Sequence, residues 1–142
     1  MASDDYIGEV LGGASVAREQ GAAALRDRVR RGLPYRSFDA VRTRLQLSVP
    51  EAAAILHMPP RTLARRRQAR RLDPLESDRL YRLARVAAYA FTALGSEPKG
   101  AAWLRRPNRA LGGEAPLALL DTDAGARQVE ALLGRLEHGI PG

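Results

Sequence analysis

The chain has 142 residues, enough for one ordinary domain or two small ones, and its lack of cysteine excludes disulfides, thiolate metal sites and cysteine nucleophiles. Its net charge of +7 is concentrated in residues 61–85, which hold nine arginines and three acidic residues, whereas six basic and six acidic residues cancel beyond position 85. Such a block is a candidate phosphate-binding surface, with a solvated arginine-rich helix face as the alternative.

The N-terminal segment, residues 1–32, is predicted to be a weakly structured extension, because glycines interrupt its apolar positions. Within it, residues 15–31 are compatible with a helix. That helix would end at Gly32, since Pro34 prevents its continuation.

Two short helices are predicted next. Ser37 is typical of an N-cap and begins a helix through Gln46. The apolar residues that share one side of this helix are Phe38, Val41 and Leu45. Ser48 is followed three residues later by Glu51, a capping-box pattern that begins a helix through Leu56.

A tight turn at His57 separates this helix from one that begins at Pro60 and runs to Arg70 or Arg71. Two short helices with such a link, the second rich in arginine, form the pattern of a helix-turn-helix. The turn position usually holds glycine in the left-handed conformation, which histidine adopts more readily than most residues. A catalytic or metal-binding His57 is disfavoured, because no Cys, Asp or second His lies near it in sequence.

The motif assigns roles to individual residues. Ala53 is small where the two helices must cross, and Ile55 and Leu63 are spaced to pack into the angle between them. The residues expected to contact DNA are Arg61, Thr62, Arg65, Arg66 and Arg70. The threonine hydroxyl would reach a phosphate, an arginine would fork onto a guanine edge, and the other arginines would neutralise phosphates. We expect both Arg65 and Arg66 to be exposed.

The second half of the chain is also predicted to be helical. Asp73, Pro74 and Glu76 form a strong helix start, and apolar residues at three- and four-residue steps continue that helix until Gly95. Shorter helices are predicted after residue 96, over 116–120 and from 122 to 139. No segment alternates apolar and polar residues, so we expect an all-α fold. A helix-turn-helix DNA-binding bundle over 33–95 would precede a small helical C-terminal domain over 96–142.

Residues 30–142 resemble the Xre/ParS/MbcA family of antitoxins in the order of several short motifs. These are Leu72-Asp73-Pro74-Leu75-Glu76, Ala102-Trp103-Leu104, Pro107-Asn108, Ala110-Leu111-Gly112-Gly113, Pro116-Leu117 and His138-Gly139. The resemblance implies a type II antitoxin that pairs with a RES-domain toxin, which attacks NAD or uses it to modify a target. It implies that the C-terminal domain covers the toxin's active site, that an Xre-like helix-turn-helix represses the operon, and that the protein is a homodimer.

The residues expected to bind the toxin are Trp103, Leu104, Asn108, Leu111, Gly112, Gly113, Gly139 and Ile140. Large apolar groups flanked by arginines are typical of an interface hot spot with a charged rim. Trp103 is equally compatible with a core anchor. In this family the C-terminus approaches the toxin's substrate pocket, so the tail 139–142 is a candidate plug, with a frayed terminus as the alternative.

The alternative function is a stand-alone helix-turn-helix regulator whose C-terminal domain senses a ligand or serves dimerisation. An enzyme is not expected, because no paired carboxylates, nucleophile–base pair or metal cluster stands out. We expect no cofactor and no metal. No apolar run approaches a membrane span and no signal peptide is visible, so we expect a cytoplasmic protein with no membrane partner.

Overall fold

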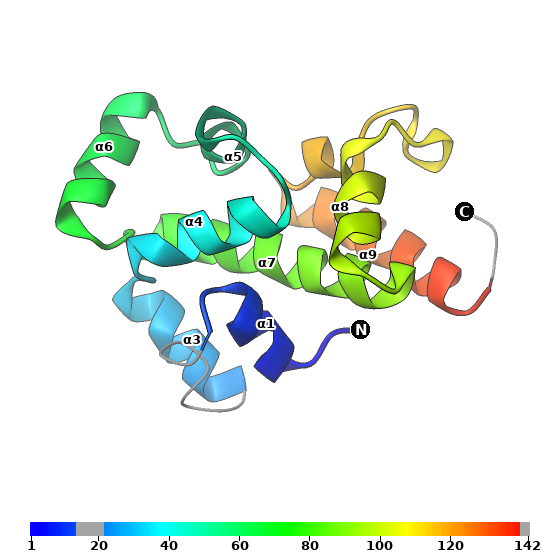
Figure 1. Ribbon diagram of the computed structural model, residues 1–142, viewed down its shortest axis with the longest axis horizontal. Helices are drawn as coiled ribbons and strands as arrows, with labels where there is room; N and C mark the ends of the chain where they lie inside the picture. The colour runs from blue at the N-terminus through cyan, green and yellow to red at the C-terminus, as the bar shows by residue number, and fades with distance from the viewer. Residues whose placement is uncertain (14–21, 140–142) are drawn as a thin grey trace.

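The longest helix of the structure, α7 (Pro74–Leu94), runs through the middle of the molecule, and other elements pack around it (Figure 1). Its start is the capping box that the sequence predicted. The Asp73 side chain accepts a hydrogen bond from the Glu76 N–H at 2.7 Å, and the Glu76 side chain accepts one from the Asp73 N–H at 3.0 Å. Gly95 ends the helix in the left-handed region, with a φ of 91°.

This computed structural model describes residues 1–13 and 22–139. The other helices are α1 (Asp4–Val10), α3 (Ala22–Arg31), α4 (Tyr35–Arg44), α5 (Val49–Ile55), α6 (Pro60–Ala69), α8 (Glu97–Arg105) and α9 (Asp123–Glu137), with the 3-10 helices η1 (Arg109–Leu111) and η2 (Pro116–Leu119). Among the described residues, the one β-type pairing is an isolated bridge between Pro34 and Arg71. The prediction of an all-α fold is confirmed.

The core is built around α7, because α1, α3, α4, α8 and α9 all pack against it. The apolar residues that recur at three- and four-residue steps, which are Leu80, Leu83, Ala84, Ala87, Ala90 and Phe91, are buried. Val86, Ala88 and Tyr89, which do not belong to that series, are buried too. A helix that is apolar nearly all round is a central core helix and not an amphipathic surface helix. The sequence pattern therefore underestimated how completely α7 is enclosed.

The N-terminal segment is a packed part of the fold, and the prediction of a weakly structured extension was wrong for residues 4–11. Ser3 caps α1 by accepting a hydrogen bond from the Tyr6 N–H at 3.2 Å. The apolar residues that α1 and its C-cap bury are Ile7, Val10 and Leu11, each at most 3% exposed. A helix of seven residues completes less than two turns, so its periodicity is too short to recognise among glycines.

The end of α3 is tied to the end of α6 by backbone hydrogen bonds. The Leu72 N–H donates to the Leu33 carbonyl at 2.9 Å, and the Tyr35 N–H donates to the Arg70 carbonyl at 3.1 Å. Gly32 has a φ of 96°, and a β-carbon there would collide with the Leu72 carbonyl oxygen. This junction closes α4, α5 and α6 into one unit. The predicted helix end at Gly32 is confirmed, while the predicted helix start at residue 15 lies outside the described residues.

The helix α4 begins earlier than predicted, because Pro34 and not Ser37 occupies its N-cap. Pro34 has a φ of −65°, and Leu33 before it is anchored by donating its N–H to the Ser77 hydroxyl at 2.8 Å. The chain therefore enters the helix as soon as it leaves the junction, and Ser37 is fully buried inside α4. The predicted apolar face of Phe38, Val41 and Leu45 is confirmed, with each residue 0% exposed.

Substitution of Gly100 by alanine is expected to destabilise the fold by about 1–3 kcal/mol, the usual cost of overpacking a core. A β-carbon at Gly100 would lie 2.7 Å from Cδ1 of Phe91 and 2.9 Å from the backbone of Ala90, where α8 crosses α7. The loss should be measured by urea denaturation. Gly134→Ala in α9 is the matched control, because its nearest atom is the Tyr89 hydroxyl at 3.1 Å. Equal stability of the two variants would contradict the close approach of α7 and α8.

Candidate nucleic-acid interface and C-terminal surface

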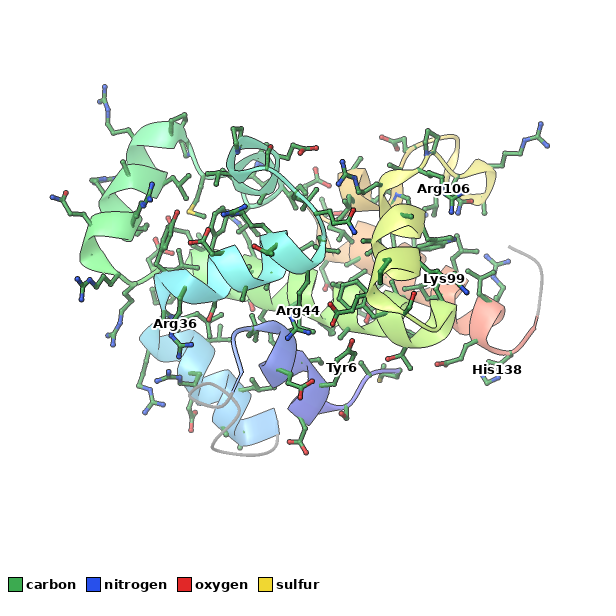
Figure 2. The ribbon with its side chains drawn as sticks, viewed as in Figure 1. Tyr6, Arg36, Arg44, Lys99, Arg106 and His138 are labelled. Atoms are coloured by element: carbon green, nitrogen blue, oxygen red, sulfur yellow. The ribbon has the colours of Figure 1, made fainter. Side chains whose placement is uncertain are left out.

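The helix α6 stands apart from the packed body of the molecule. It packs mainly against α5, and none of its residues is buried. Most of its side chains extend into solvent at the end of the molecule opposite α9 (Figures 1 and 2). Its ten residues include four arginines and no acidic residue. Positive charge is therefore concentrated on one accessible helix, as a phosphate-binding surface requires.

The turn before α6 is a Schellman motif with His57 in the left-handed region, at a φ of 54°. The His57 N–H donates to the Ala54 carbonyl at 3.1 Å, and the Met58 N–H donates to the Ala53 carbonyl at 2.9 Å. Met58 and Ala53 are both buried, which supplies the apolar contact typical of this motif. The predicted left-handed His57 is confirmed, and so is the predicted capping box of Ser48 and Glu51 on α5.

Replacing His57 with glycine is expected to stabilise the protein by about 1 kcal/mol, because a side chain in the left-handed region costs about 1–2 kcal/mol. The gain should appear as a higher Tm in thermal unfolding. Gln46, which ends α4 with a φ of 58°, offers the matched test, since Gln46→Gly should have the same sign. A clear loss of stability in both variants would contradict the structure of these turns.

The angle between α5 and α6 is an apolar groove with a volume of about 630 Å³. Its lining includes Ala53 and Met58 from the first helix and turn, Leu63 from α6, and Tyr35 from the start of α4. Ala53 and Leu63 therefore lie where the motif predicted. Ile55 does not, because it faces a separate hollow beside η2. Residues two positions apart lie on different faces of a helix, so Ala53 lines the groove while Ile55 points away from it.

The first turn of α6 presents polar groups to solvent. Pro59 is the N-cap and Pro60 the first helical residue, so no side chain caps this end. The N–H groups of Arg61 and Thr62 point out of the helix start, where a helix dipole favours an anion. Arg61 and Arg65 are exposed, and Thr62 is half-buried. Arg70, which ends the helix in the left-handed conformation, is exposed too.

Arg66 differs from the other candidate DNA contacts, and the expectation that it is exposed was wrong. Its Nε donates to the Glu76 carboxylate at 2.7 Å and its Nη2 donates to Asp73 at 3.2 Å. Arg66 is 25% exposed and Glu76 only 7%, and the hydrogen bond from Arg66 to Glu76 raises the pKa of the guanidinium. Arg66 thus joins α6 to the capping box of α7. The sequence predicted the capping box but not the arginine that binds both of its carboxylates.

A tight loop follows α8, and the end of that helix is marked by Arg106 in Figure 2. Asn108 organises it: its side chain accepts from the Ala110 N–H at 3.0 Å, and its carbonyl accepts from the Gly113 N–H at 2.9 Å. Gly112 and Gly113 have φ values of 70° and 88°, in the left-handed region that glycine adopts without strain in a tight turn. Within the loop Arg109, Ala110, Gly112, Gly113 and Glu114 are exposed.

The remaining candidate toxin contacts divide by burial. Trp103 and Leu111 pack against the core but are only half-buried, so part of each side chain is accessible. Leu104 is 0% exposed and belongs to the core, which corrects its assignment to an accessible surface. Gly139 is exposed beyond α9, and Ile140 lies outside the described residues. We call Trp103, Asn108, Leu111, Gly112 and Gly113 the loop surface.

Two further arginines connect the helix-turn-helix unit with the C-terminal helices. Arg44 of α4 donates to Glu97 at 2.6 Å, and Arg105 of α8 donates to the Gln46 carbonyl. These partners are separated by 53 and 59 residues, so no local sequence pattern indicates them.

Within residues 1–13 and 22–139, no group of three or more His, Asp or Glu side chains is arranged to hold a metal ion. None of the helices described there is long and apolar enough to cross a membrane.

Two families of known sequences match adjacent parts of the chain. Residues 24–85 match the antitoxin Xre-like helix-turn-helix domain, and residues 87–139 match the C-terminal toxin-binding domain of the Xre/MbcA/ParS antitoxins. The two matches meet inside α7, the helix against which both halves of the molecule pack.

Three curated relatives carry the name Antitoxin Xre. That of Yersinia enterocolitica is 36% identical over 118 residues, which cover 80% of this chain and 78% of the relative. That of Photorhabdus laumondii is 46% identical over 66 residues, covering 46% of this chain and 45% of the relative. That of Pseudomonas putida is 38% identical over 85 residues, covering 58% and 52%.

Proposed function

Because the chain belongs to the Xre/MbcA/ParS antitoxin family, we propose that it neutralises a toxin through its C-terminal region and binds operator DNA through α6. The proposed partner is a RES-domain toxin, encoded by the adjoining gene, that attacks NAD or uses it to modify a target. In this proposal the protein acts by binding and not by catalysis. We further propose that the protein is cytoplasmic and works as a homodimer, because helix-turn-helix proteins bind the two half-sites of an operator as dimers.

The observation that carries the DNA-binding role is the exposed, arginine-rich α6. A recognition helix inserts its N-terminal half into the major groove. In that orientation Arg61 and Arg65 reach base edges, where arginine forks onto guanine O6 and N7. Thr62 and the N–H groups of the first turn hold a phosphate. Arg70 neutralises another phosphate at the opposite end of the helix, so affinity will fall as salt rises.

The observation that supports the toxin-binding role is the loop surface. It combines two partly accessible apolar side chains, Trp103 and Leu111, with a loop made rigid by Asn108. Exposed Arg106 and Arg109 lie around it, as charged rims surround apolar interface centres. Trp103 is compatible with both roles, core anchor and toxin contact, because one part of its side chain packs on the core and another part is open to a partner. The tail from Gly139 onward is proposed as an additional contact that blocks the toxin's substrate pocket.

The experiment that tests this proposal is copurification of the protein with the product of the adjoining gene, followed by a DNA shift assay with the segment upstream of the pair. The proposal expects a stable protein complex that binds this segment in preference to a shuffled duplex. Operator binding without any toxin complex would instead favour a stand-alone regulator with a C-terminal sensing or dimerisation region.

A further inference from the structure

The fold places a second group of arginines near the end of α6, although these residues are far from α6 in the sequence. The last turn of α3 carries Arg28, Arg30 and Arg31. Residues just beyond this turn pair with the chain that leaves α6, through the hydrogen bonds between Leu33 and Leu72 and between Tyr35 and Arg70. Two basic segments about forty positions apart in sequence therefore end at the same corner.

The contact at this corner is close. The side-chain carbons Cγ and Cδ of Arg71 lie 3.2 Å from the position that a β-carbon on Gly32 would occupy. The Arg71 side chain thus runs over the backbone directly next to Arg31. Arg31, Arg70 and Arg71 are all exposed, and we call these three residues the arginine corner.

The arginine corner differs from its surroundings in its electrostatics. Arg66, one turn before Arg70, is neutralised by both Asp73 and Glu76. Among residues 1–13 and 22–139, no acidic side chain lies within ion-pair distance of the three corner residues. Arg71 packs on Gly32 next to Arg31, and the like charges of these two arginines repel one another. The dipole of α3 favours cations at its end but does not explain Arg70 and Arg71, which the chain after α6 brings there. An anion that bridges both segments would relieve this repulsion.

We propose that the arginine corner binds the DNA phosphate backbone beside the groove that α6 enters; this inference rests on the proposed DNA binding. The ten residues of α6 span about 15 Å, at about 1.5 Å per residue. The major groove is about 12 Å wide, so a helix that reads bases with its first half carries its far end to the bordering strand. The corner lies at that far end and combines Arg31 from the last turn of α3 with Arg70 and Arg71, which directly follow α6. Contacts of this kind fix the orientation of the helix and carry no sequence information.

The test compares Arg31→Gln/Arg71→Gln with the wild type over a series of salt concentrations. Glutamine keeps much of the aliphatic stem that covers Gly32 while removing the charge. The DNA probes are the segment upstream of the gene pair and a shuffled duplex of equal length. The expected result is an equal loss of affinity for both probes, with the slope of log affinity against log salt reduced by about two, one for each lost phosphate contact.

Two controls make the result decisive. Arg127→Gln/Arg135→Gln removes two charges from exposed positions on α9 and should leave the slope at its wild-type value. Arg31→Lys/Arg71→Lys keeps the charges and should keep most of the slope.

The inference is overturned if Arg31→Gln/Arg71→Gln behaves like the α9 control while Arg65→Ala still loses the operator. That outcome leaves the proposed function standing. A wild-type protein that binds neither probe overturns both.

Discussion

Arg65→Ala is expected to lower the affinity for the operator by about 5- to 150-fold at fixed salt, the range that corresponds to losing one bidentate guanine contact worth about 1–3 kcal/mol. The Tm should stay at its wild-type value, because Arg65 is exposed on a helix that contributes no buried residue. The measurement is a titration of operator and shuffled duplex, with the ratio of the two affinities as the readout. A variant that keeps the wild-type ratio would remove Arg65 from base recognition.

The neighbouring Arg66 provides the contrast, because its removal is expected to destabilise the fold by about 1–3 kcal/mol. Arg66→Ala leaves the nearly buried Glu76 carboxylate without its hydrogen-bonded cation. Adding Glu76→Gln should recover part of this loss, since glutamine is uncharged and still completes a capping box. Urea denaturation of the single and double variants measures the difference. Equal stability of Arg66→Ala and Arg65→Ala would contradict the link between α6 and α7.

Ala110→Arg is expected to abolish neutralisation of the toxin while leaving operator binding intact. Ala110 is exposed in the loop after α8, so a long charged side chain there fits the free protein but obstructs a partner that covers the loop surface. An unpaired charge forced into a packed interface costs several kcal/mol. The readout is growth of cells that co-express the toxin.

The matched control for this prediction is Ala110→Ser, which changes the same position with almost no added bulk and should still protect. Unfolding curves must show that both variants are as stable as the wild type. Full protection by Ala110→Arg would exclude the loop from the toxin interface.

Local sequence signals predicted most of the secondary structure. The boxes at Ser48 and Asp73, the left-handed His57 and the stop at Gly95 each depend on residues within a few positions of one another. These patterns correspond to backbone hydrogen bonds between nearby residues, so they can be recognised without knowledge of the tertiary fold.

Most of the errors have another cause, which is contact between residues that no local sequence pattern links. The start of α4 is set by a junction with residues 70–72, and α1 is stabilised by burial against α4 and α7. In the sequence Arg66 does not differ from the exposed arginines of its helix, because its hydrogen bond to Glu76 is visible only in the structure. The same limitation hid the arginine corner, because charge counted along the sequence separates α3 from α6.

The most direct test of the whole account places the two proposed activities in one experiment. Cells carry the adjoining toxin gene and a reporter driven by the upstream segment, together with the wild type, Arg65→Ala or Ala110→Arg. We expect that Arg65→Ala protects growth but releases the reporter, whereas Ala110→Arg represses the reporter but fails to protect. If both stable variants lose the two activities together, or if the wild type does not protect, then separate DNA-binding and toxin-binding surfaces on this chain are contradicted.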